Sequence, residues 1–510
     1  MHLMISFLEQ RKKWEPLLPH ILQEPSLVSF QKAGKSSFLP ELSPWFPSIA
    51  HLSAASLEKG ESESAPSKIG VLFSGGPASG GHNVLVGMQE LLPEGGLIGF
   101  LGGISGLIKA NFRVLRRDEV FSYRNTGGFD LLGSGRTKIE TEAQIAAIAK
   151  TCKELVLDGL VIIGGDDSQT NAACLSEAFL AQGLKTRVVG VPKTIDGDLQ
   201  TKDLPISFGF DTACRTYAEM IGNIARDALS SRKYTHFIKL MGRSASHITL
   251  ECALATQPNL ALIGEEKRSL REIVEEMARL IEARALAGKP YGVILIPEGL
   301  IEFIPEMQRL IALLGRSSES ALPAEEKKLF ESLPEKIQQQ LLLDRDPHGN
   351  VRLSQVATEE LLIGMLHPIL RERGVSSFSP QAHFFGYEGR AAYPSQFDAA
   401  YCLALGRAAV LAVRDRITGA LCTIPNLAEE VSKWQVKAVP LISLMTLEER
   451  KGKKRPVIAK ALVDLHGKAY SLFRQRRENW KSGDQYLYPG PMQFFGEAEK
   501  YHQPPLILTS

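Results

Sequence analysis

The sequence predicts an α/β protein with two lobes, each built on a mostly parallel sheet with helices on both faces. Its 510 residues are too many for one ordinary hydrophobic core. From Lys68 onwards, short apolar β-branched runs alternate with amphipathic stretches of helical length. Several of these runs end at glycine-rich polar turns, as strands of parallel sheets do. We therefore expect two α/β lobes between Lys68 and Pro440.

The composition is that of a globular protein, with 44% hydrophobic and 23% charged residues. A formal net charge of +2 gives no reason to expect nucleic-acid binding. The six cysteines form no C-x-x-C pair, which favours reduced thiols in a cytoplasmic protein. Because no uninterrupted apolar stretch is long enough to cross a bilayer, we expect no membrane association.

The chain divides into five expected regions. Residues 1–67 form an N-terminal extension, which we expect to be a packed arm followed by a flexible link from Ser53 to Ser67. Residues 68–230 form the first α/β domain, and residues 231–300 with 373–440 form the second. Residues 301–372 are rich in Leu, Glu, Lys and Gln at helical spacing, which predicts a helical insertion. Residues 441–510 are expected to return to the first domain.

Seven segments are the predicted strands of the two sheets. They are Ile69 to Phe73, Leu97 to Leu101, Gly159 to Ile163, Arg187 to Val191, Thr235 to Leu240, Leu260 to Ile263 and Tyr291 to Ile296.

The stretch Val161 to Asn171 combines an apolar run, two glycines and two carboxylates. It predicts a strand, a tight turn and a helix from Asn171 to Gln182. Backbone amides in such a turn can bind an anionic group, so Asp166 suggests a Mg²⁺ site and Asp167 a residue that repels or positions a ligand. The alternative is that both aspartates only cap the helix.

A second glycine-rich turn, Phe73 to Asn83, follows the first predicted strand. Its amides could bind a phosphate, with Gly75 and Gly76 nearest the ligand, although it matches neither the Walker pattern nor G-x-G-x-x-G. Such a turn can also serve only to reverse the chain.

A third turn, Pro192 to Asp198, carries Lys193, Asp196 and Asp198. If the segment is extended, the two carboxylates point the same way. A carboxylate there can take a proton from a hydroxyl, and the ammonium can offset charge on a transferring phosphoryl group. An ordinary turn with solvated charges is the alternative.

Three further strand ends carry charged residues that suit a phosphorylated sugar. Arg243 and Arg390 could clamp a phosphate, and Glu298 could bind hydroxyl groups. Taken singly, each is better explained as a surface charge beside a turn glycine.

Together with Asn125 to Phe129 and Leu132 to Arg136, these motifs resemble the phosphofructokinase family, and within it the pyrophosphate-dependent long form. The resemblance runs from about Lys68 to Arg390. It implies two Rossmann-like domains of the phosphofructokinase fold, the first for the phosphoryl donor and the second for the sugar phosphate. The implied activity is a reversible, Mg²⁺-dependent transfer of phosphoryl from pyrophosphate to the 1-hydroxyl of fructose 6-phosphate.

The resemblance also implies residue roles. Gly76 would contact pyrophosphate, Asp166 would serve Mg²⁺, and Asp196 would be the base, with Lys193, Asp167 and Arg243 completing the catalytic set. The remaining substrate-binding positions would be Arg136, Thr194, Ile195, Asp198, Met241, Gly242, Glu298, Tyr387, Glu388, Gly389 and Arg390. Lys233 and Tyr234 would reach the site of a neighbouring subunit, which implies a homodimer with shared active sites.

Two positions are expected to decide the phosphoryl donor. ATP-using relatives have glycine where this chain has Asp167 and Lys193. At an effective dielectric near 20, two like charges about 4 Å apart repel by roughly 4 kcal/mol, so Asp167 would exclude a nucleotide's α-phosphate. Lys193 would supply positive charge to pyrophosphate. An ATP-dependent 6-phosphofructokinase, a non-catalytic regulatory subunit, and a lipid or nicotinamide kinase are the competing hypotheses.

One residue departs from the family pattern. Ser79 stands where the first loop of the family usually has proline, so the loop loses a fixed φ. We expect slightly looser phosphate binding at this loop.

Overall fold

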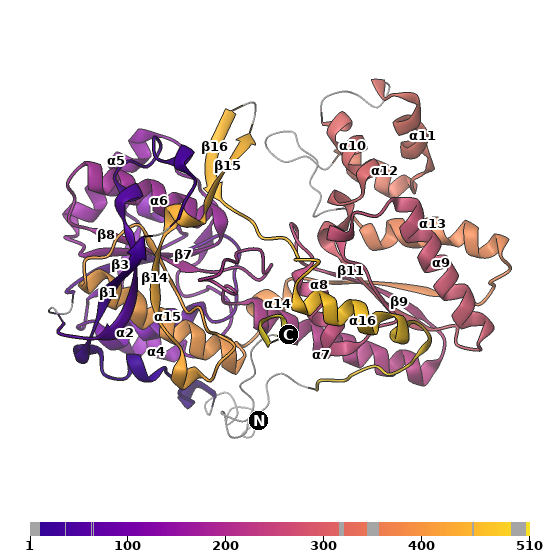
Figure 1. The fold of residues 1–510 in the computed structure, drawn as a ribbon, viewed down its shortest axis with the longest axis horizontal. Helices are drawn as coiled ribbons and strands as arrows, with labels where there is room; N and C mark the ends of the chain where they lie inside the picture. The colour runs from indigo at the N-terminus through magenta and orange to yellow at the C-terminus, as the bar shows by residue number, and fades with distance from the viewer. Residues whose placement is uncertain are drawn as a thin grey trace.

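The computed structural model describes residues 11–35, 37–62, 64, 66–315, 321–343, 356–450, 453–490 and 506–509. Figure 1 shows two lobes side by side, each with helices packed around a central sheet. The other parts of the N-terminal extension, the insertion and the C-terminal segment lie outside the described residues. Two mostly parallel sheets confirm the predicted fold class.

The first lobe is built on a sheet of ten strands in the order β1-β2-β14-β13-β8-β7-β3-β4-β5, with β6 paired to β3. Its centre, β8-β7-β3-β4, is parallel. The strands are β1 (Val28–Lys35), β2 (Ser53–Lys59), β3 (Ile69–Ser74), β4 (Leu97–Phe100), β5 (Phe112–Val114), β6 (Ser134–Gly135), β7 (Gly159–Gly164), β8 (Arg187–Pro192), β13 (Ala420–Thr423) and β14 (Lys437–Pro440).

Helices cover both faces of this sheet because side chains alternate along each central strand. Val71 and Phe73 of β3 pack in one core with α2 and α15, whereas Leu72 between them packs in another core with α3, α5 and α6. The helices of this lobe are α2 (Gly81–Leu91), α3 (Ile104–Ile108), α4 (Arg117–Ser122), α5 (Glu142–Glu154), α6 (Asp166–Ala181) and α15 (Gln396–Arg414).

The second lobe has four parallel strands in the order β10-β11-β9-β12. Residues of α7 and α8 pack on one face, and residues of α9 and α13 on the other. The elements are α7 (Phe210–Ser231), β9 (Thr235–Leu240), α8 (His247–Thr256), β10 (Leu260–Ala261), α9 (Leu270–Leu286), β11 (Gly292–Pro297), α13 (Thr358–Glu372), β12 (Pro380–Phe385) and the short α14 (Glu388–Ala391).

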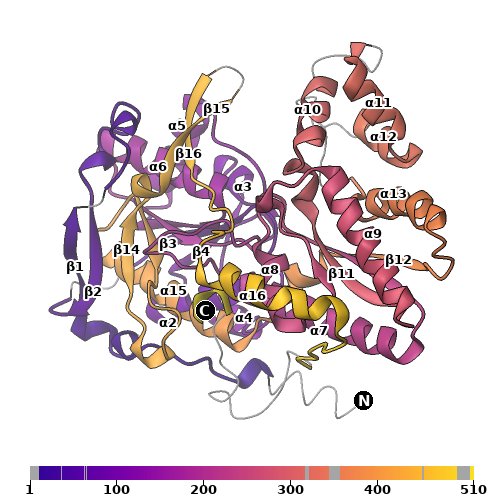
Figure 2. The ribbon, with the colours of Figure 1, turned by 45° about the vertical axis from the view of Figure 1, so that its right-hand side comes forward.

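The region 301–372 is helical over its described residues, as the sequence predicts. It contributes α10 (Pro305–Leu314), α11 (Ala324–Ser332), α12 (Glu335–Leu343) and α13. Leu310, Phe330 and Ile337 join the core that α9 and α13 form, so these helices extend the second lobe (Figure 2).

Four expected domain assignments were wrong. Helix α7 (Phe210–Ser231), expected in the first domain, packs on β9 and β11 of the second lobe. Ser53 to Lys59 is not part of a flexible link but strand β2, which pairs with β14 in the first sheet. Residues 396–440 belong to the first lobe rather than the second, because α15 packs against α2 and both β13 and β14 lie in the first sheet. The C-terminal segment returns only partly to the first lobe. Its hairpin of β15 (Met445–Arg450) and β16 (Lys453–Ile458) contacts α6 of the first lobe. Its helices α16 (Lys468–Ser482) and α18 (Leu506–Thr509) pack on α8 of the second lobe.

Helix α15 is the one helix among the described residues that is long and apolar enough to cross a membrane, but 89% of its apolar window is buried inside the protein. This burial is typical of a helix in the core of the protein. All six cysteines are free thiols, as predicted.

Candidate functional site

The carboxyl ends of β3, β7 and β8 in the first lobe and of β9, β11 and β12 in the second open into one cleft of about 710 Å³. Open α/β sheets place their ligands at this edge. Fourteen of the predicted site residues line the cleft: Gly76, Arg136, Asp166, Asp167, Lys193, Thr194, Ile195, Asp196, Asp198, Met241, Arg243, Glu298, Tyr387 and Arg390.

The first glycine loop contacts the second lobe directly. Gly75 has φ +86°, a conformation that glycine adopts without strain. A Cβ at Gly76 would collide with the guanidinium of Arg390, so glycine at this position lets that arginine reach the side of the cleft that the first lobe forms. Ser79 is fully buried and its hydroxyl donates to the Ala392 carbonyl at 2.6 Å, which ties the loop to the chain after Arg390.

Helix α6 begins at Asp166, whereas the sequence suggested Asn171, so both aspartates lie in its first turn. The N-cap residue is Gly165, which has no side chain to cap this end of the helix, and residues 165–168 line the cleft. The Asp167 carboxylate lies 2.9 Å from the ammonium of Lys138, and both side chains are about half exposed. The charge expected to repel a nucleotide is thus paired with a lysine.

Lys193 is buried, and its ammonium donates to the Gly76 carbonyl at 2.7 Å. Burial lowers the pKa of this ammonium to about 8, and the carboxylate of Asp196 only partly offsets that effect. A lysine held this way keeps a positive charge beside the first glycine loop at neutral pH.

The segment after Lys193 is a turn rather than the extended chain expected, with Gly197 at φ +73°. Both Asp196 and Asp198 nevertheless line the cleft. The backbone N–H of Asp196 donates to the Thr194 hydroxyl at 3.1 Å, which fixes the turn. Burial, with the neighbouring Asp196 and Asp166 carboxylates, raises the pKa of Asp198 to about 7.

In the second lobe, Glu298 is buried and its carboxylate accepts the Gly242 N–H at 3.0 Å. Burial raises the pKa of Glu298 above its usual range. Arg243 follows β9 into the cleft, and the Arg390 guanidinium lies 5.5 Å from the Tyr387 ring centre. These groups are suited to hold the phosphate and hydroxyls of a sugar phosphate.

Five predicted residues do not line the cleft of this chain. Gly242 stands behind it and orients Glu298. The Glu388 carboxylate accepts the Gly386 N–H at 2.8 Å, and Gly389 packs against Tyr217. Lys233 and Tyr234 precede β9, at the end of that strand remote from the cleft.

Three charged residues of the cleft were missed by sequence reasoning: Lys138, Glu302 and Lys460. Each lies outside a glycine-rich turn that follows a strand, so the pattern used to find the others does not include it. Lys138 follows the short strand β6, Glu302 ends the turn after β11, and Lys460 comes from the C-terminal segment.

Within the described residues, no group of three or more His, Cys, Asp or Glu side chains could by itself hold a metal ion. Mg²⁺ usually keeps several waters and takes only one or two carboxylates together with substrate phosphates. Asp166, at the cleft end of α6, fits that partial role.

The chain matches the family model described as phosphofructokinase over residues 68–413. It is 49% identical over 474 residues to a pyrophosphate–fructose 6-phosphate 1-phosphotransferase of Treponema pallidum (strain Nichols), covering 86% of this chain and 83% of that protein. It is 46% identical over 520 residues to the beta subunit of the enzyme of that name from Solanum tuberosum, covering 96% and 91%. A crystal structure of a pyrophosphate-dependent phosphofructokinase from Marinobacter aquaeolei has the same fold, with a TM-score of 0.56, 18% identity and coverage of 82% and 93%.

Proposed function

Because the chain belongs to the phosphofructokinase family, we propose that it catalyses the reversible transfer of phosphoryl from pyrophosphate to the 1-hydroxyl of fructose 6-phosphate, giving fructose 1,6-bisphosphate and phosphate. The first lobe binds the donor and the second binds the sugar phosphate. The observation that carries the proposal is that Asp167, Lys193 and Asp196 all line one cleft.

Asp196 acts as the general base. Its carboxylate takes the proton of the 1-hydroxyl while that oxygen bonds to the transferred phosphorus and the bond to the leaving phosphate breaks. Support comes from its place on the turn after β8, where it faces the residues that follow β9 and β11. Asp198 lies on the same turn and is buried, and its pKa is raised to about 7. The proposed mechanism assigns the role of base to Asp196 and not to Asp198.

Lys193 stabilises the charge that gathers on the phosphoryl donor and on the leaving phosphate. Its anchor on the Gly76 carbonyl fixes the ammonium at the first glycine loop, where the donor enters. Arg136 and Arg390 add positive charge along the same wall. The donor is held by this wall and by the amides at the start of α6.

Mg²⁺ held at Asp166 would neutralise charge on the donor oxygens. The Asp166 carboxylate lies in the first turn of α6, where a phosphate and the metal could share one site.

Arg243, Met241 and Glu298 bind fructose 6-phosphate, with Arg390 reaching it from α14, which follows β12. The carboxylate of Glu298 is oriented by the Gly242 N–H and accepts sugar hydroxyls. We also propose a cytoplasmic homodimer in which Lys233 and Tyr234 contribute to the active site of the neighbouring subunit. The relative from Solanum tuberosum is itself named as a subunit.

The test is ³¹P NMR of the purified full chain mixed with pyrophosphate, fructose 6-phosphate and Mg²⁺. We expect fructose 1,6-bisphosphate and phosphate to appear in equal amounts, and the reaction to run backwards from those products. Consumption of pyrophosphate without a sugar bisphosphate would contradict the proposal.

A further inference from the structure

The C-terminal segment crosses from one lobe to the other and passes the cleft on the way. After β16, which stands by the first lobe, the chain runs to α16 on the second lobe (Figure 1). Residue Lys460, near the start of this crossing, lines the cleft. No residue of this segment was among those predicted for the site.

The Lys460 ammonium contacts both lobes. It donates to the Ser244 hydroxyl at 3.0 Å, in the loop after β9, and lies 3.5 Å from the Asp166 carboxylate at the start of α6. The Lys460 side chain is 34% exposed and lines the cleft, where a ligand can contact it.

Backbone hydrogen bonds on both sides of Lys460 fix its place. The Ile458 N–H donates to the Thr170 hydroxyl at 3.2 Å, and the Ala461 N–H donates to the Asp198 carbonyl at 2.7 Å. Farther on, the Val463 N–H donates to the Glu265 carboxylate at 3.0 Å. The crossing is therefore a built part of the cleft wall.

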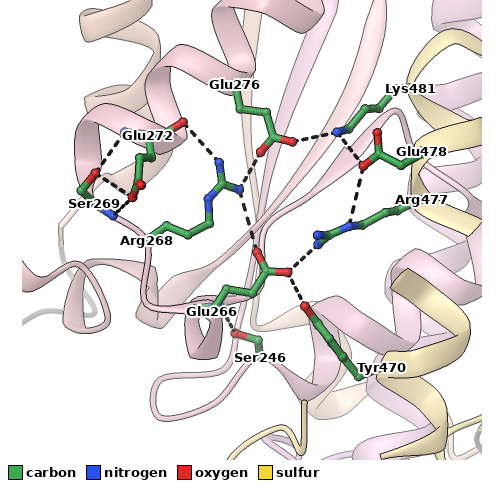
Figure 3. Close-up of polar contacts among 11 residues, drawn as sticks. Ser246, Glu266, Arg268, Ser269, Glu272, Glu276, Tyr470, Arg477, Glu478 and Lys481 are labelled. Atoms are coloured by element: carbon green, nitrogen blue, oxygen red, sulfur yellow. Dashed lines mark hydrogen bonds and ion pairs between the residues drawn. The ribbon is translucent and has the colours of Figure 1, made fainter. Parts of the chain in front are cut away.

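A charged network fastens the far end of the crossing to the second lobe (Figure 3). Glu266 accepts the Tyr470 hydroxyl at 2.6 Å and pairs with Arg477, both on α16. Lys481 at the end of the same helix pairs with Glu276 of α9 at 2.9 Å. With α16 held at several points, the position of the crossing does not depend on the Lys460 ion pair alone.

Lys460 interacts with three carboxylates of the cleft, those of Asp166, Asp198 and Glu302. Six carboxylates line the cleft, and they equal in number the six cationic side chains: Asp166, Asp167, Asp196, Asp198, Glu298 and Glu302 against Arg136, Lys138, Lys193, Arg243, Arg390 and Lys460. Lys460 lowers the pKa of both Asp198 and Glu302, against the larger effect of their burial. A polyanion entering this side of the cleft needs a cation that offsets Asp166 and its neighbours.

We propose that Lys460 is a further donor-binding residue, whose ammonium binds phosphate oxygens of pyrophosphate on the side of the cleft that Asp166 occupies. This inference rests on the proposed function. Lys460 and Lys193 then hold the donor from two segments that are far apart in the sequence.

The test is calorimetric titration of the full chain with pyrophosphate and, separately, with fructose 6-phosphate. Because a hydrogen bond to a charged group contributes about 1.5–3 kcal/mol, Lys460→Met should weaken pyrophosphate binding by roughly 10-fold to 100-fold. Fructose 6-phosphate binding should stay within about twofold, since that ligand is held by the second lobe. Lys460→Arg should recover most of the pyrophosphate affinity because the positive charge is kept.

Two controls separate donor binding from a structural tie. Ser244→Ala removes the hydroxyl that holds Lys460 but keeps the ammonium, and Lys454→Met removes an exposed lysine of β16. Both should leave pyrophosphate affinity within about threefold of wild type, a change of less than 1 kcal/mol.

Equal pyrophosphate affinity in wild type and Lys460→Met would overturn the inference. An equal loss of pyrophosphate affinity in Ser244→Ala and Lys460→Met would also overturn it. The same holds if Lys460→Met loses affinity for both ligands equally and has a lowered melting temperature, because each result indicates that Lys460 only holds the two lobes together. A wild-type chain that fails to bind pyrophosphate at all would instead overturn the proposed donor, and this inference with it.

Discussion

The Asp167 carboxylate and the Lys138 ammonium form an ion pair at 2.9 Å on the donor side of the cleft. Because both side chains are about half exposed, the pair itself adds at most about 1 kcal/mol to stability. The pair also bears on the choice of donor. Because Lys138 offsets the charge of Asp167, we expect the pair to exclude a nucleotide mainly by the space that the two side chains fill. The repulsion of roughly 4 kcal/mol expected for an isolated carboxylate is therefore an upper limit.

The double substitution Asp167→Gly with Lys193→Gly should shift the donor preference towards ATP. It clears the space at the start of α6 and removes the ammonium beside Gly76. We expect kcat/KM for pyrophosphate to fall by roughly 10-fold to 100-fold, as for the loss of one charged hydrogen bond. The corresponding value for ATP should rise. Steady-state kinetics with both donors gives the ratio, and an unchanged ratio would remove these two residues from donor selection.

Asp196→Asn should lower kcat by about 10²-fold to 10⁴-fold, because amide nitrogen and oxygen cannot accept the hydroxyl proton. Fructose 6-phosphate should still bind with near wild-type affinity in a calorimetric titration. Asp118→Asn, which changes an exposed carboxylate on α4, is the matched control and should leave kcat and fructose 6-phosphate affinity unchanged. Wild-type turnover in Asp196→Asn would exclude this residue as the base.

Donor binding should weaken above about pH 8 because the pKa of Lys193 is lowered to about 8 by burial. Below that pH the ammonium is protonated and binds phosphate oxygens; above it the neutral amine does not. The profile of kcat/KM for pyrophosphate should thus fall on the alkaline side near pH 8. In Lys193→Arg the fall should move to higher pH, since arginine stays charged. The same alkaline limb in both proteins would assign the titration to another group.

Gly76→Ala should impair both substrates, because the added methyl group would displace the Arg390 guanidinium. We expect KM for pyrophosphate and for fructose 6-phosphate to rise together, by roughly 10-fold or more if one charged hydrogen bond is lost. Gly315→Ala is a suitable control, since φ there is −73° and the new Cβ would make only ordinary contacts. A rise for one substrate alone would show that Arg390 does not link the two sites.

The sequence predicted the parts of the structure that short patterns determine. Strands such as β7 and β11 are apolar runs buried along their whole length, and the polar turns that follow them form the cleft. Parallel strands bring their carboxyl ends to one edge of a sheet, which is why Gly76, Asp166 and Lys193, which follow β3, β7 and β8 of the first sheet, could be expected to meet.

What the sequence did not predict depends on contacts between remote segments. Strand β13 pairs with β8 and strand β14 with β2, so the chain returns to the first sheet after the last strand of the second sheet. Lys460 reaches the cleft only because that return continues across both lobes. Neither short runs nor turn motifs contain such information, because β pairing between distant segments is fixed by the packing of the whole fold.

The most direct test of pyrophosphate as the phosphoryl donor compares kcat/KM for pyrophosphate and for ATP. Both values are measured on the purified wild-type chain with saturating fructose 6-phosphate and Mg²⁺. We expect turnover with pyrophosphate and a value for ATP lower by at least about 100-fold, which corresponds to close to 3 kcal/mol of discrimination at the cleft. Equal or faster turnover with ATP would contradict the assignment of pyrophosphate as the phosphoryl donor.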